Sequence, residues 1–521
     1  MASLFRPFPG RALRFTRKPS YLGTRLYSTP SARTPKPGLS TLRLMAGIGC
    51  GLAVGLGVSQ YLREKAVAAD IPSKPVFAAR TGVVSTDPDD LQIHGLSTHT
   101  YHTGVSHSVV VYPESTEDVV QIVKIAIKYK MPITGQFIGR PGGGICVDMT
   151  SMNKILEIHE ADADVVCQPG LGWMELNETL KERGIDIDNH FVIDPAPDAT
   201  IGGMASTGCS GTNAVRYGTA KAEWFLNLTV VLPNGEVIKT RRRSRKSSAG
   251  FDMTKLFIGA EGTLGIITEV TIRLAPLLPT TVASVQFPNV KAAVEASIEI
   301  LRSGIASGIQ CVELVDDSFL AATNKHSASS HKYSESDGLF FKFQGGTPGA
   351  LAETAQMTRA ICTAHGGTDF RLAKDAEEAA DIWADRKNAH FAGMALVPGA
   401  RALATDVCVP VSQLPKLVLD TKADLKANGI VHLIVGHVGD GNFHALLLFS
   451  DEEEHARAQE AAHRMIERAI ALDGTCTGEH GVGVGKREYL AIKRTIDPLG
   501  LFNPGKLYPD DEDPELARGH A

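Results

Sequence analysis

The sequence predicts an α+β fold divided into two or three domains, and three observations lead to this prediction. The chain has 521 residues, 43% of them hydrophobic and 21% charged, which is enough for more than one core. A strand-helix-strand pattern begins at residue 108, and residues 279–471 alternate between helical and strand periods. Many of the 51 glycines fall in loops between these patterns, and the sequence contains no periodic repeat.

Residues 1–43 have the composition of a mitochondrial presequence. Arginine and lysine recur along this stretch among serines and threonines, and the first acidic residue of the chain is Glu64. There is no early apolar core of the kind found in secretory signals. An arginine-rich leader without acids is typical of mitochondrial transit peptides. The alternative is a disordered basic arm without a targeting role.

Residues 44–62 form an uncharged segment that predicts a membrane anchor. The segment is rich in glycine and alanine and lies between Arg43 and Arg63. Its apolar part is shorter than the run of about 20 residues that usually spans a bilayer. We expect a stop-transfer signal that anchors the protein in the inner mitochondrial membrane; the alternative is a longer targeting peptide that is removed whole. Residues 63–107 are expected to form a linker and an amino-terminal arm.

Three glycine-rich segments follow the opening strand-helix-strand pattern of residues 108–134. They cover residues 194–203, 207–218 and 257–268, and the last runs into a strand pattern. Small residues and hydroxyl side chains let backbone N–H groups approach a ligand closely and donate hydrogen bonds to it. A lone glycine-rich loop is more often only a turn, but three in this order indicate a binding site for a flat cofactor ring.

Composition excludes several other classes of protein. A net charge of −5 and a pI near 6.4 provide no basic field for nucleic acid. The eight cysteines include no Cys-x-x-Cys pair, which argues against a disulfide framework, a zinc ribbon or an iron–sulfur cluster. The dinucleotide fingerprint Gly-x-Gly-x-x-Gly does not follow the first predicted strand, which argues against a nicotinamide-binding Rossmann domain.

Two clusters in the carboxy-terminal half carry residues suited to chemistry. His437 and His444 flank a Gly-Asp-Gly turn between apolar runs, so we expect them at facing ends of two hairpin strands. A glycine-rich loop at residues 474–483 carries Glu479 and His480. Two imidazoles and a carboxylate can form a metal site with open positions for substrate, although each histidine taken alone is more often structural.

The motifs of both halves resemble the vanillyl-alcohol-oxidase-type FAD enzymes, and within them the mitochondrial D-lactate dehydrogenases that reduce cytochrome c. The resemblance rests on ATIGGM at residues 199–204, TGCSGTNAVRYGT at 207–219 and FIGAEGTLGIITE at 257–269, and it extends from about residue 108 to residue 510. It implies a two-subdomain PCMH-type FAD-binding domain at residues 108–278 and a ferredoxin-like α+β cap domain of the FAD-linked oxidases at residues 279–480. The segment 481–521 would return to the flavin.

The resemblance further implies non-covalent FAD lined by residues of the three glycine-rich segments and of the carboxy-terminal segment. These residues are Pro195, Ile201, Gly202, Gly203, Thr207, Ser210, Gly211, Thr212, Asn213, Gly218, Glu261, Gly262, Gly265, Ile266, Ile267, Thr268 and Asn503.

One departure from the family pattern lies between Thr134 and Gly135. Members of the family place a loop similar to Tyr-Ser-Gly-Gly-Thr-Ser-Leu-Glu-Gly here, and its backbone amides wrap the FAD pyrophosphate. This chain passes directly to the tail of that loop and then to residues 139–144, which hold Arg140 and three consecutive glycines. Either Gly142–Gly144 provide a substitute, or the sequence lacks a short coding stretch, or the chain binds FAD weakly. We favour the second explanation, because every other element is present.

The resemblance assigns His437, His444 and Glu479 to a divalent metal, Zn or Mn, and His480 to acid/base catalysis. Arg386 matches the arginine that binds the substrate carboxylate, since a guanidinium can hold a carboxylate in a bidentate manner. The expected reaction is oxidation of D-lactate, a small D-2-hydroxy acid, to pyruvate. The metal would lower the pKa of the hydroxyl, His480 would take its proton, and hydride would pass to FAD, with cytochrome c as final acceptor.

Two alternatives stay open at this stage. One is a D-2-hydroxyglutarate dehydrogenase, which would require a second cation for the distal carboxylate. The other is a non-enzymatic, FAD-free paralogue, which only the shortened segment after Thr134 suggests.

Overall fold

The computed structural model of this protein describes residues 83–95, 105–135, 142–183, 189–327, 331–483, 497 and 501–503. The chain divides into two units, residues 1–73 and 74–521, and every described residue belongs to the second. The predicted presequence and membrane anchor, most of the predicted linker, and Arg140 therefore lie outside the described residues.

The first sheet confirms the predicted strand-helix-strand opening of the amino-terminal half. Helix α3 connects β2 to β3, and both of these strands pair in parallel with β4. The helix begins after Ser115, whose side chain accepts a hydrogen bond from the backbone N–H of Asp118. The apolar side chains of α3 repeat at helical spacing and are buried against the sheet. In order across the sheet the strands are β1 (Val84–Ser85), β2 (Val109–Val111), β4 (Ile145–Val147) and β3 (Ile133–Thr134); the helices are α2 (Pro88–Gly95) and α3 (Thr116–Tyr129).

The second sheet is antiparallel and holds the rest of the amino-terminal half. Its central strand, β10, continues directly from the glycine-rich segment at residues 257–268. In order across the sheet the strands are β5 (Ile155–His159), β6 (Asp164–Cys167), β10 (Ile266–Arg273), β8 (Phe225–Val231) and β9 (Val237–Lys239). The accompanying helices are α4 (Trp173–Glu182), α5 (Ile201–Thr207), α6 (Ala214–Tyr217) and α7 (Met253–Phe257), and β7 (Asn189–His190) pairs with β11 (Ala275–Pro276).

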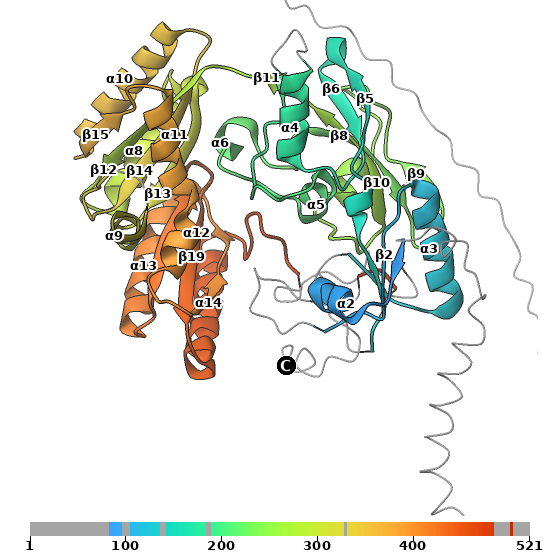
Figure 1. Ribbon diagram of the computed structural model, residues 1–521. Coiled ribbons are helices and arrows are strands. Elements are labelled where there is room, and N and C mark those ends of the chain that lie inside the picture. The colour runs from blue at the N-terminus through green and yellow to red at the C-terminus, as the bar shows by residue number, and fades with distance from the viewer. Residues whose placement is uncertain are drawn as a thin grey trace, which may run out of the picture. The chain divides into compact units, whose positions relative to one another are not determined.

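An eight-stranded antiparallel sheet forms the predicted α+β cap (Figure 1). Its strands run in the order β15 (Thr368–Leu372), β12 (Thr280–Gln286), β14 (Gly338–Gln344), β13 (Ile309–Val315), β18 (His432–His437), β19 (Asn442–Phe449) and β16 (Arg401–Ala404), and β17 (Val407–Cys408) also pairs with β19. The helices are α8 (Val290–Arg302), α9 (Asp317–His326), α10 (Pro348–Ala364), α11 (Ala376–Lys387), α12 (Ala389–Met394), α13 (Leu414–Ala427) and α14 (Glu452–Ala471).

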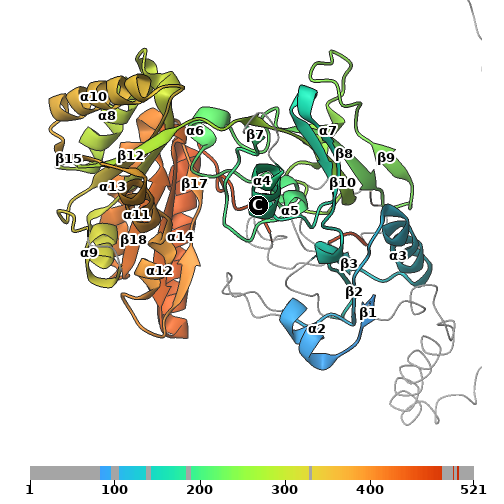
Figure 2. The ribbon, with the colours of Figure 1, turned by 45° about the horizontal axis from the view of Figure 1, so that its top comes forward.

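Helices cover both faces of this sheet, and each face has its own core (Figure 2). Along β18, Ile434 packs with α8, α10, α13 and α14, whereas Leu433 and Val435 pack with α9, α11 and α12. Side chains of a strand alternate between faces, so this division fixes the direction of every residue in the central strands. The face under α11 is the one that carries the candidate site.

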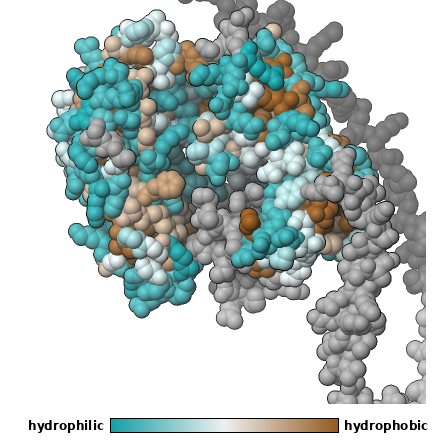
Figure 3. All heavy atoms as spheres, viewed as in Figure 1, coloured by the Kyte–Doolittle hydropathy of each residue, from teal (hydrophilic) through white to brown (hydrophobic). Residues whose placement is uncertain are grey.

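Within the described ranges no helix combines the length and the apolar character needed to cross a bilayer. On the face shown in Figure 3 the surface is largely hydrophilic, and apolar side chains form small separate patches.

Candidate active site

Three neighbouring strands of the cap sheet present polar side chains on one face. In β13 the side chains of Cys311 and Val315 join the core under α11, so Glu313 points the same way. Pairing of Leu314 with Gly436 places Glu313 beside His437, and pairing of Val435 with His444 places both histidines on this face. The register of the sheet therefore brings Glu313, His437 and His444 together, and the predicted hairpin placement of the histidines is confirmed.

His437, His444 and Glu479, which we call the donor cluster, meet at a single carboxylate oxygen. Nε2 of His437 lies 3.1 Å and Nε2 of His444 lies 3.0 Å from Oε1 of Glu479. The imidazole rings are 5.4 Å apart and nearly perpendicular. Donor atoms of the three side chains all lie within 4.8 Å of one another, a separation that one cation could bridge. Nitrogen and carboxylate donors in this number suit Zn or Mn with an open coordination position, so the residues present fit a divalent cation.

The second nitrogen of each histidine is held by the protein. Nδ1 of His437 donates to Oε1 of Glu313 at 2.9 Å, and Nδ1 of His444 donates to the carbonyl of Thr405 at 3.1 Å. Carboxylate and carbonyl oxygens can only accept, so both Nδ1 atoms carry the proton and both Nε2 atoms face the cluster. This arrangement of outer partners is the one that fixes metal-binding histidines in proteins.

Glu313 also connects the donor cluster to Arg386. Nη2 of Arg386 donates to Oε2 of Glu313 at 2.5 Å, and the two side chains are only 7% and 1% exposed. Nε of Arg386 is buried and has no hydrogen-bonding partner among the described residues. Glu313 stands in no recognisable sequence motif, but a glutamate inside the apolar run of β13 was a usable signal, because a buried carboxylate requires a partner.

The electrostatics of the cluster follow from this packing. Burial disfavours the charged imidazole of His437, but Glu313 and Glu479 outweigh that effect and raise its pKa well above the usual value. Burial likewise opposes ionisation of Glu479, but His437 and His444 lower its pKa well below the usual range. Since a metal ligand must be deprotonated at the ligating atom, a cation would compete with the proton on Nε2 of His437.

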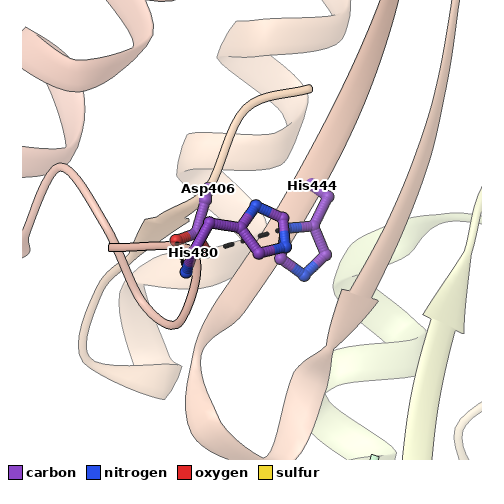
Figure 4. Close-up of side chains that lie close together, drawn as sticks. All are labelled: Asp406, His444 and His480. Carbon is purple, nitrogen blue, oxygen red and sulfur yellow. Dashed lines mark hydrogen bonds and ion pairs between the residues drawn. The ribbon is translucent and has the colours of Figure 1, made fainter. Parts of the chain in front are cut away.

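His480, the predicted acid/base, lies next to the donor cluster and is half exposed. Its side chain is 49% exposed, its ring stacks on that of His444 with centroids 4.7 Å apart, and its Nε2 lies 3.7 Å from Oε1 of Glu479. Asp406, which the sequence analysis missed, groups with His444 and His480 (Figure 4). Asp406 follows β16, and its carboxylate binds the loop that carries Glu479 and His480.

Helix α5 and the loop after it hold many of the residues predicted to line the flavin. Gly203 and Thr207 are exposed on α5, whereas Ile201 and Gly202 are buried. A Cβ atom on Gly202 would lie 2.3 Å from Cβ of Pro169, and one on Gly211 would lie 2.7 Å from Oδ1 of Asp194. These two glycines are therefore required for close packing inside the protein, whatever ligand approaches from outside.

Asp194, directly before Pro195, organises the loop that follows α5. Its carboxylate accepts hydrogen bonds from the hydroxyl of Thr212 at 2.6 Å and from the backbone N–H of Asn213 at 2.9 Å. The side chain of Asn213 donates to the carbonyl of Val192 and accepts from Gln310 of the cap strand β13. Ser210 of this loop is buried, and Gly218, with φ of +78°, ends α6.

The third glycine-rich segment reaches the 474–483 loop and Asn503. Glu261 has φ of +47°, and its carboxylate accepts from the backbone N–H groups of Val482 and Gly483. Asn503 donates from its side chain to the carbonyl of Glu261 at 2.6 Å, and Gly262, with φ of +70°, lies beside it. Gly265 packs its backbone against Val230 and Val231, and the next residues, Ile266, Ile267 and Thr268, start β10.

Gly203 and Thr207, which are exposed on α5, and the half-buried Gly262 leave surface that fits the approach of an FAD. Gly203 is exposed on α5, and Gly262 has a positive φ, so a flat ligand could approach the chain closely at these two positions. Most of the predicted flavin residues lie on α5, on the loop after it or at the start of β10. Gly262 and Asn503 lie beside Glu261, and Pro195 precedes α5.

The pyrophosphate side is less complete in the part of the chain that the structure describes. Gly142, Gly143 and Gly144 all have positive φ, but the N–H of Gly144 donates to the hydroxyl of Ser108 at 3.1 Å. The Thr134 hydroxyl is engaged with His107 at 3.2 Å. Of the proposed substitute amides, that of Gly144 is therefore already used within the protein.

Comparison with known proteins agrees with the fold and the motifs. The family profile described as "FAD binding domain" matches residues 107–241, and that described as "FAD linked oxidases, C-terminal domain" matches residues 279–507. A 4-ethylphenol oxidase from Gulosibacter chungangensis has the same fold, with a TM-score of 0.64 at 20% identity over 90% of this chain and 99% of the other.

Two curated relatives are much more similar in sequence. The mitochondrial D-lactate dehydrogenase (cytochrome) of Arabidopsis thaliana is 42% identical over 82% of this chain and 78% of the relative. The probable mitochondrial D-lactate dehydrogenase of Danio rerio is 41% identical over 77% of this chain and 84% of the relative. This chain therefore belongs to the FAD-linked oxidase family, in the branch that contains the mitochondrial D-lactate dehydrogenases.

Proposed function

We propose that this protein is a mitochondrial FAD-dependent dehydrogenase that oxidises D-lactate to pyruvate and passes the electrons to cytochrome c. The relative at 42% identity is named a mitochondrial D-lactate dehydrogenase (cytochrome), and the relative at 41% identity is named a probable mitochondrial D-lactate dehydrogenase. The observation that carries the proposal is the convergence of His437, His444 and Glu479 beside His480 in a chain whose family binds FAD. That arrangement suits deprotonation of a hydroxyl next to a carboxylate.

The residues of the site divide the work as follows. Arg386 binds the substrate carboxylate, and its ion pair with Glu313 orients the guanidinium for this role. The donor cluster would hold a divalent cation, Zn or Mn, which supplies Lewis-acid polarisation of the substrate hydroxyl. His480 takes the proton of that hydroxyl, because its side chain is half exposed next to the cluster.

FAD, when bound, supplies the two-electron acceptor for the hydrogen on C2 of the substrate. Gly203, Thr207 and Gly262 would lie beside the ring, while Asn213 and Thr212 keep their loop in place through Asp194. The reaction balances, since one proton goes to His480 and one hydride leaves C2, which converts the 2-hydroxy acid to a 2-keto acid.

We further propose that residues 1–43 direct the protein to mitochondria and that residues 44–62 anchor it in the inner membrane. The composition of both segments supports this. Carbonate extraction of isolated mitochondria, with and without residues 44–62, tests the anchor: the full chain should stay in the pellet and the deletion should be released. Release of both proteins would rule the anchor out.

Substrate oxidation coupled to reduction of cytochrome c tests the main proposal. We expect turnover with D-lactate, none with L-lactate, and much weaker turnover with D-2-hydroxyglutarate. A chelator should abolish turnover, and Zn or Mn should restore it. Preference for D-2-hydroxyglutarate would replace the proposed substrate, and turnover unchanged by the chelator would remove the cation. A purified chain that neither carries nor takes up FAD would be the inactive paralogue.

A further inference from the structure

The loop at residues 474–483 has little conformational preference of its own. Its sequence, GTCTGEHGVG, contains four glycines, and glycine loses more conformational freedom on ordering than any other residue. Yet this loop supplies Glu479 to the donor cluster and places His480 on His444. Contacts from outside the loop must therefore select the one conformation that serves the site.

Asp406 provides the first set of contacts. Its Oδ2 accepts three successive backbone N–H groups, those of Gly478, Glu479 and His480, each at 2.9 Å, as well as the hydroxyl of Thr477 at 2.6 Å. Its Oδ1 accepts from the side chain of Asn442 at 2.9 Å. The carboxylate is 1% exposed, so these charge-assisted hydrogen bonds form in a setting that strengthens them.

Glu261 provides the second set, from the amino-terminal half of the chain. Its two oxygens accept the N–H groups of Val482 at 2.6 Å and of Gly483 at 2.9 Å. Gly481 lies between the two sets with φ of +79°, and a Cβ atom there would come within 2.6 Å of Oε1 of Glu261. Only glycine therefore fits at this position with the carboxylate in place.

The backbone of Glu261 is in turn fixed. Its φ of +47° is uncommon for a residue with a side chain, its N–H donates to the carbonyl of Ser206 at 2.8 Å, and its carbonyl accepts from Asn503 at 2.6 Å. Its side chain thus reaches the loop from a rigid base. Two carboxylates, one from each half of the chain, hold the backbone on both sides of Gly481.

We propose that Asp406 and Glu261 are positioning residues, which hold the 474–483 loop so that Glu479 completes the metal site and His480 meets the substrate hydroxyl. This rests on the proposed function for the roles of Glu479 and His480. Glu261, which the family resemblance assigns to the flavin, acts here on the loop through its carboxylate. Neither residue touches the reacting atoms.

Asp406→Asn and Glu261→Gln in the full-length protein test the proposal, and Asp451→Asn is the matched control. Asp451 also accepts a backbone N–H, that of Glu454 at 2.8 Å, but it caps α14 on the protein surface. Amide hydrogen exchange should show the N–H groups of Gly478–His480 and of Val482–Gly483 protected in the wild type. Asp406→Asn should lose protection at the first set and Glu261→Gln at the second, and Asp451→Asn should change neither.

The turnover number and the cation affinity distinguish a positioning role from a purely structural one, because a purely structural role would leave both unchanged in the folded variants. A misplacement of about 1 Å can cost about 100-fold in rate, so at saturating cation we expect kcat to fall by that order in both variants while KM for D-lactate changes little. Zn or Mn affinity, measured by titration without substrate, should fall about 10–100-fold. Asp451→Asn should match the wild type in all three.

Two results would overturn the proposal: unchanged exchange in both variants, or increased exchange with wild-type kcat and cation affinity. If the melting curve shows that Asp406→Asn does not fold, amide exchange, kcat and cation affinity of Glu261→Gln alone test the proposal. A wild-type protein without D-lactate oxidation would defeat the proposed function, while exchange and cation titration would still decide the role of the two carboxylates.

Discussion

The donor cluster and the predicted flavin residues differ in what their polar atoms do. In the donor cluster, Nε2 of His437 and Nε2 of His444 face Glu479, and the remaining polar atoms of the histidines are bound by Glu313 and Thr405. Among the flavin residues, the side chains of Thr212, Asn213 and Glu261 already bind protein partners.

The two regions therefore differ in whether their polar side-chain atoms are directed toward a ligand or used within the protein. The donor atoms of the cluster already lie within 4.8 Å of one another, so its geometry would suit a cation without rearrangement. Thr212, Asn213 and Glu261 use their side chains to hold the shape of their loops, so we expect contacts with FAD at positions such as Gly203 and Gly262 instead.

Removal of the acid/base group should have the largest effect. We expect His480→Gln to lower kcat by about 10²–10⁴-fold, the usual contribution of a positioned general base, with cation affinity little changed. Steady-state oxidation of D-lactate measures this. His463→Gln, at an exposed histidine on α14, is the control and should keep wild-type rates. Near-normal turnover of His480→Gln would exclude the acid/base role.

Insertion of the family's pyrophosphate loop should strengthen the binding of FAD. Insertion of Tyr-Ser-Gly-Gly-Thr-Ser-Leu-Glu-Gly between Thr134 and Gly135 adds backbone N–H donors for the pyrophosphate. Two hydrogen bonds to a charged group contribute about 3 kcal/mol, so the Kd for FAD should fall about 100-fold. Flavin fluorescence titration measures it, and the same insertion between Ser247 and Ser248 controls for length. Equal FAD affinity with and without the loop at Thr134 would show that the chain has another way to bind the pyrophosphate.

Glu313→Gln should weaken cation binding at the donor cluster and lower the stability of the protein. Loss of the charge leaves Arg386 buried without an anionic partner and weakens the hold on Nδ1 of His437. Affinity for Zn or Mn should fall about 10–100-fold, and removal of one partner of a buried ion pair should cost about 3–5 kcal/mol of stability. Metal titration and urea unfolding measure the two effects. The control is Glu453→Gln, at an exposed glutamate paired with Arg457, and unchanged metal affinity in Glu313→Gln would remove Glu313 from the site.

His94→Gln should have the smallest effect, and one that depends on pH. Burial opposes the charge on His94, but hydrogen bonds to Asp90 and Asp148 outweigh it and raise its pKa. A raised pKa in the folded state gives stability that is complete below about pH 6.5, the unfolded value, and is lost as pH rises through the folded value. Urea unfolding should therefore show a loss of about 1–2 kcal/mol at low pH and a smaller loss in base.

His94 is connected to the segment where the pyrophosphate loop is expected. The carbonyl of His94 accepts from His107, whose other ring nitrogen meets Thr134, the residue before the missing loop. A loss that is equal at all pH values would show that His94 is neutral in the folded protein. His463→Gln is again the control, because its side chain is 73% exposed and its removal should leave stability unchanged.

Local signals in the sequence were sufficient for the elements they covered. The strand-helix-strand pattern that begins at residue 108 predicted β2 and α3, and the Gly-Asp-Gly turn predicted the hairpin of His437 and His444. Each of these patterns is complete within a short stretch of chain. The order of eight strands in the cap sheet depends on pairings between distant segments, so no local pattern contained it.

The same limit explains the two acids that the sequence analysis missed. Glu313 lies 124 positions from His437, its partner, and Asp406 lies 73 positions from Glu479, so neither stands in a recognisable motif. Only their burial distinguishes them from surface acids, and burial follows from sheet register. Gly202 and Gly211 show a related limit, because the motif that predicts their contact with FAD does not show that their backbone also packs closely against Pro169 and Asp194.

The shared carboxylate of Glu313 has a thermodynamic consequence. One of its oxygens binds His437, a proposed metal ligand, and the other binds Arg386, the proposed partner of the substrate carboxylate, so we expect binding of the cation and of the substrate to be coupled. Linkage requires that any factor by which the cation tightens D-lactate binding is also the factor by which D-lactate tightens the cation. Substrate supply would then help to keep the enzyme metallated, and scarcity of either ligand would weaken retention of the other.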